Sequence, residues 1–313
     1  MPELPEVQTT VNGLNRTIVG LRIANVWSNY DSSYFKDSQT IKDPAYFVVF
    51  KKIVMGSTVV SAERRAKNIL IHLDNGQTIL IHMKMTGHLL YGTYRFDASL
   101  PKDPWQPVEP ESLKDPFNRH VRFLISFDDG TSLALSDVRK FAKVTASPSA
   151  ILHESEHLRE IGPEPLDPDF TFEAFTTRID KRPNGKIKQV LMDQSILAGI
   201  GNIYADESLW RASIHPLTQV KSVSTLQRRE LFQAILQTLS RGIDFGGDST
   251  SDYRNIDGEK GSFHEQHYAY RMTGTPCQKK DCIGTITRIV LGGRGTHFCS
   301  EHQKYVKKKA AHK

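Results

Sequence analysis

Residues 186–216 read KIKQVLMDQSILAGIGNIYADESLWRASIHP, and this stretch decides how the second half of the chain folds. Apolar residues recur at helical spacing on both sides of GIGN, which predicts two helices joined by a tight turn. Asn202 is a good N-cap residue, so we expect the second helix to begin there. Such a turn leaves backbone N–H groups that can bind an anion, and Lys188 adds positive charge beside it. GIGN alone equally fits a turn that only joins two packed helices.

A metal-binding pattern lies further along the chain. The spacing is Cys277-x4-Cys282, then sixteen residues, then Cys299-x2-His302. Two close ligand pairs separated by a hairpin-length insert suit tetrahedral zinc, and four protein ligands leave no position open for a reacting water. The pattern therefore predicts one structural Zn²⁺. Reduced structural thiols are the alternative.

The segment between the two ligand pairs predicts a β-hairpin whose arms meet at GGRG. Arg294 would then stand near the tip, where it could bind a phosphate or enter a nucleic-acid groove. Residues 271–313 hold ten Lys or Arg and two Asp or Glu, although the whole chain carries a net charge of only +6. This concentration favours a local surface for a polyanion. For the last ten residues, a solvated basic tail is an equal alternative.

The first 145 residues are mainly β-rich. After a helical pattern in ELPEVQTTVNGLNRTI, six to eight short β-rich runs follow, some joined by the turns DNG and DDG. They predict a β-sandwich or flattened barrel. Residues 94–118 contain five prolines and cannot form a central strand, so we expect a loop there.

The later part of the chain predicts a second, helical region. The proline-rich stretch 161–170 marks the crossover to it. Within LQRRELFQAILQTLSRGI, the residues Leu226, Leu231, Ile235 and Leu239 fall on one helical face. The expected fold class is α+β, with an N-terminal β-sandwich and a C-terminal helical domain that carries the metal hairpin. The expected domain ranges are 1–145, a linker at 146–170, helices at 171–262, and the metal module with the basic tail at 263–313.

The N-terminal sequence MPELPEV has a possible chemical role. If Met1 is removed, Pro2 presents a secondary amine whose ordinary pKa of ~8 lies well below the ~10.4 of a lysine side chain. Such an amine can attack a sugar C1′ and form an iminium, with Glu3 as proton donor and acceptor. The alternative is that the two prolines simply stiffen an irregular start.

The composition is that of an ordinary soluble protein, with 38% hydrophobic and 24% charged residues. No apolar run approaches the ~18 residues of a membrane span, and the N-terminus lacks a signal-peptide pattern. We expect an intracellular, cytoplasmic protein that is not secreted, and that is associated with the nucleoid if it is bacterial.

Taken together, these stretches resemble the formamidopyrimidine-DNA glycosylase family, which includes the endonuclease VIII branch. PELPEV, RRAKNIL, HMKMTGHL, SDVRKFA, IGPEPL, LMDQSILAGIGNIYADESLW, DGEKGSF and the metal hairpin occur in the order found in that family and span nearly the whole chain. The resemblance implies a β-sandwich with a catalytic terminus, a helix–two-turn–helix domain and a zinc finger. It also implies a monomer that binds damaged double-stranded DNA.

The resemblance also implies residue roles. Pro2 would be the nucleophile, Glu3 the acid/base and Glu6 a supporting carboxylate. Three residues would bind the phosphates around an extruded nucleotide: Lys67, Asn202 and Arg294. Three others would fill the space that the nucleotide leaves: Met85, Arg139 and Phe141. Lys188 is a further expected DNA contact, because its charge lies beside the GIGN turn.

The implied activity is that of a bifunctional DNA glycosylase and AP lyase acting on oxidised purines. The sequences PELPEV and STSDYRNIDGEKGSF resemble the purine-directed branch, in which the second covers the flipped base. Three alternatives remain: an oxidised-pyrimidine glycosylase, a non-catalytic damaged-DNA-binding protein of the same fold, and a zinc-ribbon RNA-binding or transcription factor.

The chain departs from the family pattern at three places. The first cysteine pair is wider than the usual C-x2-C, and His302 stands where the family has a fourth cysteine. Val138 and Lys140 differ from the commoner DPRRF sequence. The proline-rich stretch at 94–118 is longer than usual.

Overall fold

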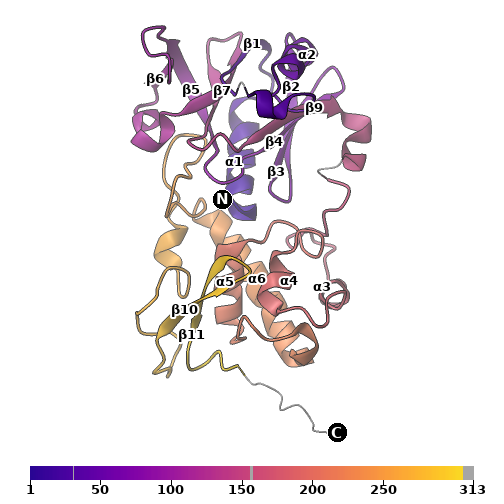
Figure 1. Cartoon of the computed structure of the whole chain (residues 1–313), viewed down its shortest axis with the longest axis vertical. Helices are drawn as coiled ribbons and strands as arrows, with labels where there is room; N and C mark the ends of the chain where they lie inside the picture. The colour runs from indigo at the N-terminus through magenta and orange to yellow at the C-terminus, as the bar shows by residue number, and fades with distance from the viewer. Residues whose placement is uncertain (31, 156–157, 306–313) are drawn as a thin grey trace. The chain divides into compact units, whose positions relative to one another are not determined.

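The computed structural model describes residues 1–30, 32–155 and 158–305. By their contacts these residues form two compact units, Met1–Arg159 with Gly242–His264, and Glu160–Arg241 with Glu265–Lys313. The ribbon in Figure 1 shows the sheets in the first unit and most of the helices in the second. The predicted α+β class, with N-terminal sheets and a C-terminal helical region ending in a β-hairpin, is confirmed.

The first unit contains two antiparallel sheets. The five-stranded sheet has the order β1-β7-β8-β5-β6 and the four-stranded sheet the order β2-β3-β4-β9. The strands are β1 (Ile23–Ser28), β2 (Val59–Arg65), β3 (Asn68–Leu73), β4 (Gln77–His82), β5 (His88–Phe96), β6 (Trp105–Glu109), β7 (Val121–Phe127), β8 (Ser132–Ser136) and β9 (Lys143–Pro148).

Side chains from both sheets and from two helices form one core in this unit. Helix α1 (Leu4–Thr17) confirms the helical pattern of the N-terminal sequence: Val7, Val11 and Leu14 on its buried face are at most 3% exposed. Helix α2 (Pro44–Val54) adds Phe50, and Ile256 enters the same core from the far end of the unit's sequence. Burial of this apolar surface is the main term that stabilises the unit.

The proline-rich stretch at 94–118 differs from the expected loop. It contains strand β6 (Trp105–Glu109), which pairs with β5 at the edge of the five-stranded sheet. An edge position tolerates Pro107 because one side of an edge strand needs no ladder hydrogen bonds. Short 3₁₀ helices η2 (Glu111–Lys114) and η3 (Pro116–Asn118) follow. We call residues 97–118 the β5–β7 excursion.

The second unit is built from helices and one hairpin. The irregular stretch 161–170 precedes helix α3 (Phe172–Ile179), followed by α4 (Ile187–Met192), α5 (Asn202–Arg211) and α6 (Thr225–Asp244), and the hairpin pairs β10 (Ile286–Leu291) with β11 (Arg294–Cys299). The described residues also form the 3₁₀ helices η1 (Ser33–Phe35), η4 (Ser149–Glu154), η5 (Val220–Ser222) and η6 (Phe263–Gln266).

The apolar stripe of α6 is confirmed only in part. Leu231, Ile235 and Leu239 are buried, whereas Leu226 is 68% exposed. Leu226 lies in the first turn of the helix, before the stripe reaches the rest of the unit. No helix in the described parts of the chain is long and apolar enough to cross a membrane.

Residues 242–264 belong to a different unit from the one that the expected domain ranges give them. The sequence places them at the end of the helical region, but their contacts lie with the N-terminal unit. Ile256 is buried in the core of that unit, and the Ile256 carbonyl accepts a hydrogen bond from the Tyr91 N–H of β5 at 2.8 Å. The chain segment after α6 thus packs against the sheets of the N-terminal unit.

Candidate active site and metal centre

The N-terminal residues are held by a reciprocal cap on α1. Glu3 is the N-cap residue: its side chain accepts the backbone N–H of Glu6, and the Glu6 Oε2 accepts the backbone N–H of Glu3 at 2.7 Å. This capping box satisfies two N–H groups that an uncapped helix leaves without partners. Pro2 is buried, and Glu3 and Glu6 are only 3% and 1% exposed. Both carboxylates therefore have fixed positions beside Pro2.

Glu6 also fastens the segment that follows α6. Its Oε1 accepts the Asp248 N–H at 2.8 Å, and its backbone carbonyl accepts the Tyr253 hydroxyl at 3.0 Å. Gly247 has a φ of +87°, and a Cβ there would lie 2.9 Å from the Glu6 Cγ. Glycine is needed at this position both for its backbone conformation and for its close approach to Glu6.

Lys67 lies in the tight turn between β2 and β3. Arg65 pairs with Asn68, so Ala66 and Lys67 form a two-residue hairpin turn, with Ala66 at a φ of +53°. Lys67 is 6% exposed. This turn fixes the backbone position of Lys67. The sequence motif RRAKN contains every residue of the turn.

Met85, Arg139 and Phe141 lie on two turns that are bonded to each other. Met85 is half-buried in the turn between β4 and β5, whereas Arg139 and Phe141 are exposed after β8. The Arg139 guanidinium stacks 4.4 Å over the Phe141 ring. The Arg139 N–H donates to the Thr86 hydroxyl at 3.2 Å, which joins the two turns. The structure thus places the three predicted residues on two adjoining turns, and we refer to them together as a cluster.

Asp137 is the buried carboxylate that supports this cluster. Its Oδ1 accepts the Thr86 hydroxyl at 2.5 Å, and its Oδ2 accepts the Tyr30 hydroxyl at 2.9 Å and the Ala142 N–H at 2.8 Å. Hydrogen bonds to an ionised carboxylate are about twice as strong as neutral ones. Burial, followed by the charge of Asp137, raises the pKa of Tyr30, so the phenol stays protonated and donates. Sequence reasoning missed Asp137, although a carboxylate directly after an apolar strand is a usable signal.

In the second unit, Lys188, Asn202 and Arg294 meet at the hairpin. The Gly295 carbonyl, next to Arg294, accepts from the Asn202 Nδ2 at 3.0 Å and from the Lys188 Nζ at 3.3 Å. Arg294 is exposed, and together with Lys188 and the start of the hairpin turn it lines a pocket of about 210 Å³ beside α4. The three residues predicted to contact DNA within this unit are therefore neighbours.

Two details of this group differ from the sequence analysis. Gly201, not Asn202, is the N-cap of α5, and the Asn202 side chain is turned to the hairpin instead of capping the helix. Lys188 is 1% exposed, with its ammonium 2.7 Å from the Asp206 carboxylate and 2.8 Å from the Thr296 hydroxyl. Lys188 therefore lies in the interior, paired with Asp206, whereas we expected it to contact DNA.

Two further carboxylates of α5 were missed from the sequence. Asp206 receives, besides Lys188, the backbone N–H of His297 at 2.9 Å. Glu207 accepts three successive backbone N–H groups, from residues 268 to 270. Each carboxylate anchors a different part of the metal module to α5. Acidic residues on the otherwise apolar face of NIYADESLW were the signal for this role.

The four predicted metal ligands converge. The ligand atoms of Cys277, Cys282, Cys299 and His302 all lie within 4.8 Å of one another. The His302 Nδ1 is 3.4 Å from the Cys277 Sγ and 3.6 Å from the Cys282 Sγ, which is itself 3.6 Å from the Cys299 Sγ. Ligands around zinc at Zn–S of about 2.3 Å and Zn–N of about 2.0–2.1 Å would be roughly 3.5–3.8 Å apart. The four side chains thus form a cage of the right size for a metal ion.

Hydrogen bonds and burial around the cage favour the protonation states in which His302 and Cys282 bind a metal ion. The His302 Nε2 donates to the Trp210 carbonyl at 3.1 Å, which leaves Nδ1 as the metal-facing nitrogen. Burial lowers the pKa of His302 and so favours the neutral imidazole that binds metal. The Gly284 N–H donates to the Cys282 Sγ at 3.4 Å and lowers the pKa of that thiol. Histidine replaces the fourth cysteine with no change in the number of ligands.

Comparison with known proteins agrees with this arrangement. Residues 1–144 match the family model of the formamidopyrimidine-DNA glycosylase N-terminal domain, and residues 161–254 match that of the formamidopyrimidine-DNA glycosylase H2TH domain. Formamidopyrimidine-DNA glycosylases of Heliobacterium modesticaldum and Halalkalibacterium halodurans are 36% and 38% identical to this chain. Each alignment covers 97% of this chain and all of the relative.

Solved structures give the same result. The Lactococcus lactis Fpg in complex with DNA that contains an abasic site matches with a TM-score of 0.80 and 28% identity, over 97% of this chain and 100% of that one. The MutM (Fpg) protein of Thermus thermophilus matches with a TM-score of 0.75 and 30% identity, over 96% and 98%. By its two matching domains and its full-length relatives, the chain belongs to the formamidopyrimidine-DNA glycosylase family, the DNA glycosylases of base-excision repair.

Proposed function

We propose that this protein is a bifunctional DNA glycosylase and AP lyase that removes oxidised purines, 8-oxoguanine and formamidopyrimidines, from double-stranded DNA. The observation that carries the proposal is the start of α1, where the buried carboxylates of Glu3 and Glu6 cap each other directly after Pro2. A secondary amine next to a fixed carboxylate is the pair of groups that amine catalysis at a sugar requires.

The proposed reaction begins once Met1 has been removed. The unprotonated Pro2 nitrogen attacks C1′ of the damaged nucleotide and the bond from C1′ to the base breaks, so that the base leaves with the proton that the nitrogen gives up. Glu3 protonates O4′, the sugar ring opens and the nitrogen–C1′ bond becomes an iminium. Loss of a C2′ proton then expels the 3′ phosphate by β-elimination, and a second, δ-elimination expels the 5′ phosphate. Hydrolysis of the iminium releases the sugar fragment and restores the amine.

The other predicted residues would serve DNA binding. We propose that Lys67, Asn202 and Arg294 bind backbone phosphates, with Lys188 supporting Arg294 from within the protein. We further propose that the cluster of Met85, Arg139 and Phe141 fills the space left by the extruded nucleotide. Extrusion costs a few kcal/mol of stacking, which inserted apolar and guanidinium groups partly offset.

We also propose a role for each region and for the metal. The N-terminal unit, which includes residues 242–264, would carry the catalytic site, and the helices before residue 242 with the metal module would hold the DNA. The metal is proposed to be one structural Zn²⁺, because its four ligands leave no position for substrate. We propose a monomer that acts in the cytoplasm, where it would be associated with the nucleoid if it is bacterial, because its substrate is genomic DNA.

Borohydride trapping tests the proposal. Reduction of the iminium should link the wild-type protein covalently to DNA containing 8-oxoguanine, and Pro2→Gly should abolish or sharply reduce the link. Pro5→Ala is the matched control, because it removes the second proline of the same stretch and leaves the terminal amine intact. A protein that binds the DNA but is never trapped would be the non-catalytic alternative. If a matched duplex with an oxidised pyrimidine is cut faster than the 8-oxoguanine duplex, the protein is the alternative oxidised-pyrimidine glycosylase.

A further inference from the structure

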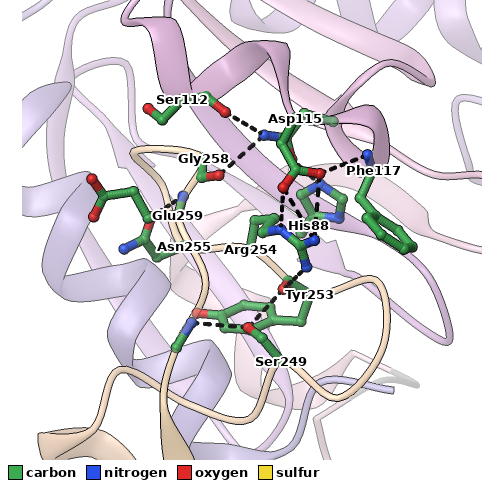
Figure 2. A network of polar contacts seen from close by, with 12 residues as sticks. His88, Ser112, Asp115, Phe117, Ser249, Tyr253, Arg254, Asn255, Gly258 and Glu259 are labelled. Atoms are coloured by element: carbon green, nitrogen blue, oxygen red, sulfur yellow. Dashed lines mark hydrogen bonds and ion pairs between the residues drawn. The ribbon is translucent and has the colours of Figure 1, made fainter.

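A polar network joins the β5–β7 excursion to the segment after α6. The segment, residues 248–259, lies against η2 and η3, as Figure 2 shows. Asn118 of η3 accepts a hydrogen bond from the buried His88 at 2.9 Å and donates to the Ser112 carbonyl at 3.1 Å and to the Gly258 carbonyl at 3.2 Å. One buried amide therefore ties strand β5, the excursion and the segment together.

Arg254 is the strongest tie in the network. Its side chain is 1% exposed, and its guanidinium lies 3.2–3.3 Å from the Asp115 carboxylate. The same guanidinium donates to the carbonyls of Ser251 at 3.2 Å and Tyr253 at 2.9 Å. A guanidinium in these positions fixes the backbone of the segment relative to the excursion, because it bonds to both.

The pairing of Asp115 is electrostatically favourable. Burial alone would raise the pKa of the Asp115 carboxyl, but the Phe117 N–H and the Arg254 guanidinium outweigh it and hold the pKa below its ordinary value. The Arg254 guanidinium also lies 4.6 Å over the Phe117 ring. Asp115 is thus ionised at neutral pH and balances a charge that is almost fully buried.

The other end of the segment is tied to the candidate active site. Asp248 and Tyr253 bond to Glu6, which in turn holds the Glu3 N–H beside Pro2. The intervening residues 250–252 form a short tip that is less buried than the residues on either side. The tip is therefore flanked by two residues that bond to Glu6, Asp248 before it and Tyr253 after it, and the Arg254–Asp115 pair follows directly after Tyr253.

We propose that Asp115 and Arg254 are positioning residues, which hold residues 250–252 in the place from which this segment covers the base, the role that the family resemblance implies for it. The inference rests on the proposed function of Pro2. The C1′ atom that Pro2 would attack is bonded directly to the base, so a tip whose flanking residues bond to Glu6 would lie near that base. The β5–β7 excursion would thereby support recognition of the base without touching DNA itself.

If Asp115 and Arg254 have this role, loss of their pairing should slow the reaction on one DNA substrate and leave the reaction on another nearly unchanged. Excision of a damaged base needs the tip, whereas cleavage at an abasic site needs only the amine and its carboxylates. Asp115→Asn is the test variant, because Asp115 is the more exposed partner and asparagine keeps its shape. Glu111→Gln is the matched control, because it removes one carboxylate of the same excursion from an exposed pair with Lys114.

Single-turnover rates on duplexes of one sequence, with either 8-oxoguanine or an abasic site, provide the measurement. We expect Asp115→Asn to slow excision of 8-oxoguanine by about tenfold, in keeping with the loss of a charge-assisted hydrogen bond. The abasic rate should change by less than about twofold, and Glu111→Gln should change neither rate. Equal slowing on both substrates, or no slowing on either, would overturn the inference.

A second measurement separates this inference from the proposed function. Amide hydrogen exchange of the free protein reports the position of the segment whether or not the protein cuts DNA. Asp115→Asn should speed exchange at residues 248–253 by about tenfold, and Glu111→Gln should leave it unchanged. Unchanged exchange in Asp115→Asn would contradict the inference, whereas a wild type that neither cuts nor is trapped on either DNA would contradict the proposed function.

Discussion

The Glu6 carboxylate accepts the backbone N–H of Glu3 at 2.7 Å, while the Glu3 carboxylate accepts the N–H of Glu6 in return. This arrangement is a common helix cap, but here it lies directly after Pro2. The same hydrogen bonds that begin α1 also fix a buried carboxylate next to the proposed nucleophile. The stability of the helix cap and the proposed proton transfer therefore depend on the same two side chains. Different substitutions of these side chains can separate the two effects.

Glu3→Gln should separate proton transfer from capping. The glutamine oxygen can still accept the Glu6 N–H, so the midpoint of thermal unfolding should fall by only a few degrees. Loss of a positioned acid/base should slow strand cleavage at an abasic site by about 10²–10⁴-fold. A single-turnover assay with thermal unfolding of the same preparation checks both. Normal cleavage by the variant would exclude Glu3 as the proton donor.

Glu6→Ala should instead destabilise the N-terminal unit. Its removal leaves the buried N–H groups of Glu3 and Asp248 without their acceptor, at a cost of about 1–3 kcal/mol each. Chemical unfolding measures the loss. Asn12→Ala, on the exposed side of the same helix, is the control and should change stability by less than about 0.5 kcal/mol.

Arg294 and Lys188 should give opposite phenotypes. Arg294→Ala removes an exposed cation, so it should weaken DNA binding across sequences and reduce the salt slope by about one, with little change in stability. Lys188→Met leaves the buried Asp206 carboxylate without its ammonium and should destabilise the fold by about 3–5 kcal/mol. Salt-dependent binding and chemical unfolding of both variants test this. A stable Lys188→Met protein with weakened DNA binding would mean that Lys188 contacts DNA directly.

Chelation should unfold the metal module and abolish DNA binding. A bound metal would join four side chains that come from two separate ligand pairs, so metal binding contributes directly to folding. Trp210 stacks on Tyr268 at 4.4 Å and contacts the ring of His302, so its fluorescence should change when the metal leaves. Elemental analysis should find about one zinc per chain before chelation. Full activity in metal-free protein would contradict the proposal.

His88 should make stability depend on pH between about 4 and 6.5. Burial lowers the pKa of this fully buried imidazole from 6.5 to about 4. Between these values the unfolded chain binds a proton that the folded protein does not, so stability falls as the pH falls. The full effect is about 3 kcal/mol at pH 4. Chemical unfolding across this range, with His88→Gln as the non-titrating comparison, should show a flatter profile for the variant.

The sequence by itself predicted the features that depend on neighbours along the chain. The spacing of the cysteines and His302, the glycine turn before α5 and the apolar face of α1 each reflect local geometry, and the structure has all three. Helical and turn preferences act over a few residues, so they can be recognised in a linear pattern. The motifs also indicated the family, which the full-length comparisons confirmed.

Only the tertiary structure decided which charged side chains are buried and which distant segments meet. Lys188 and Arg294 are both basic residues for which the sequence predicted DNA contacts, yet Lys188 is buried and paired with Asp206, whereas Arg294 is exposed to solvent. Residues 242–264 follow a helix in sequence but pack against strands, with Arg254 bonded to Asp115. Burial and pairing depend on contacts between residues far apart in the chain. No local pattern records those contacts, because the free energy that selects them is shared by the whole packed unit.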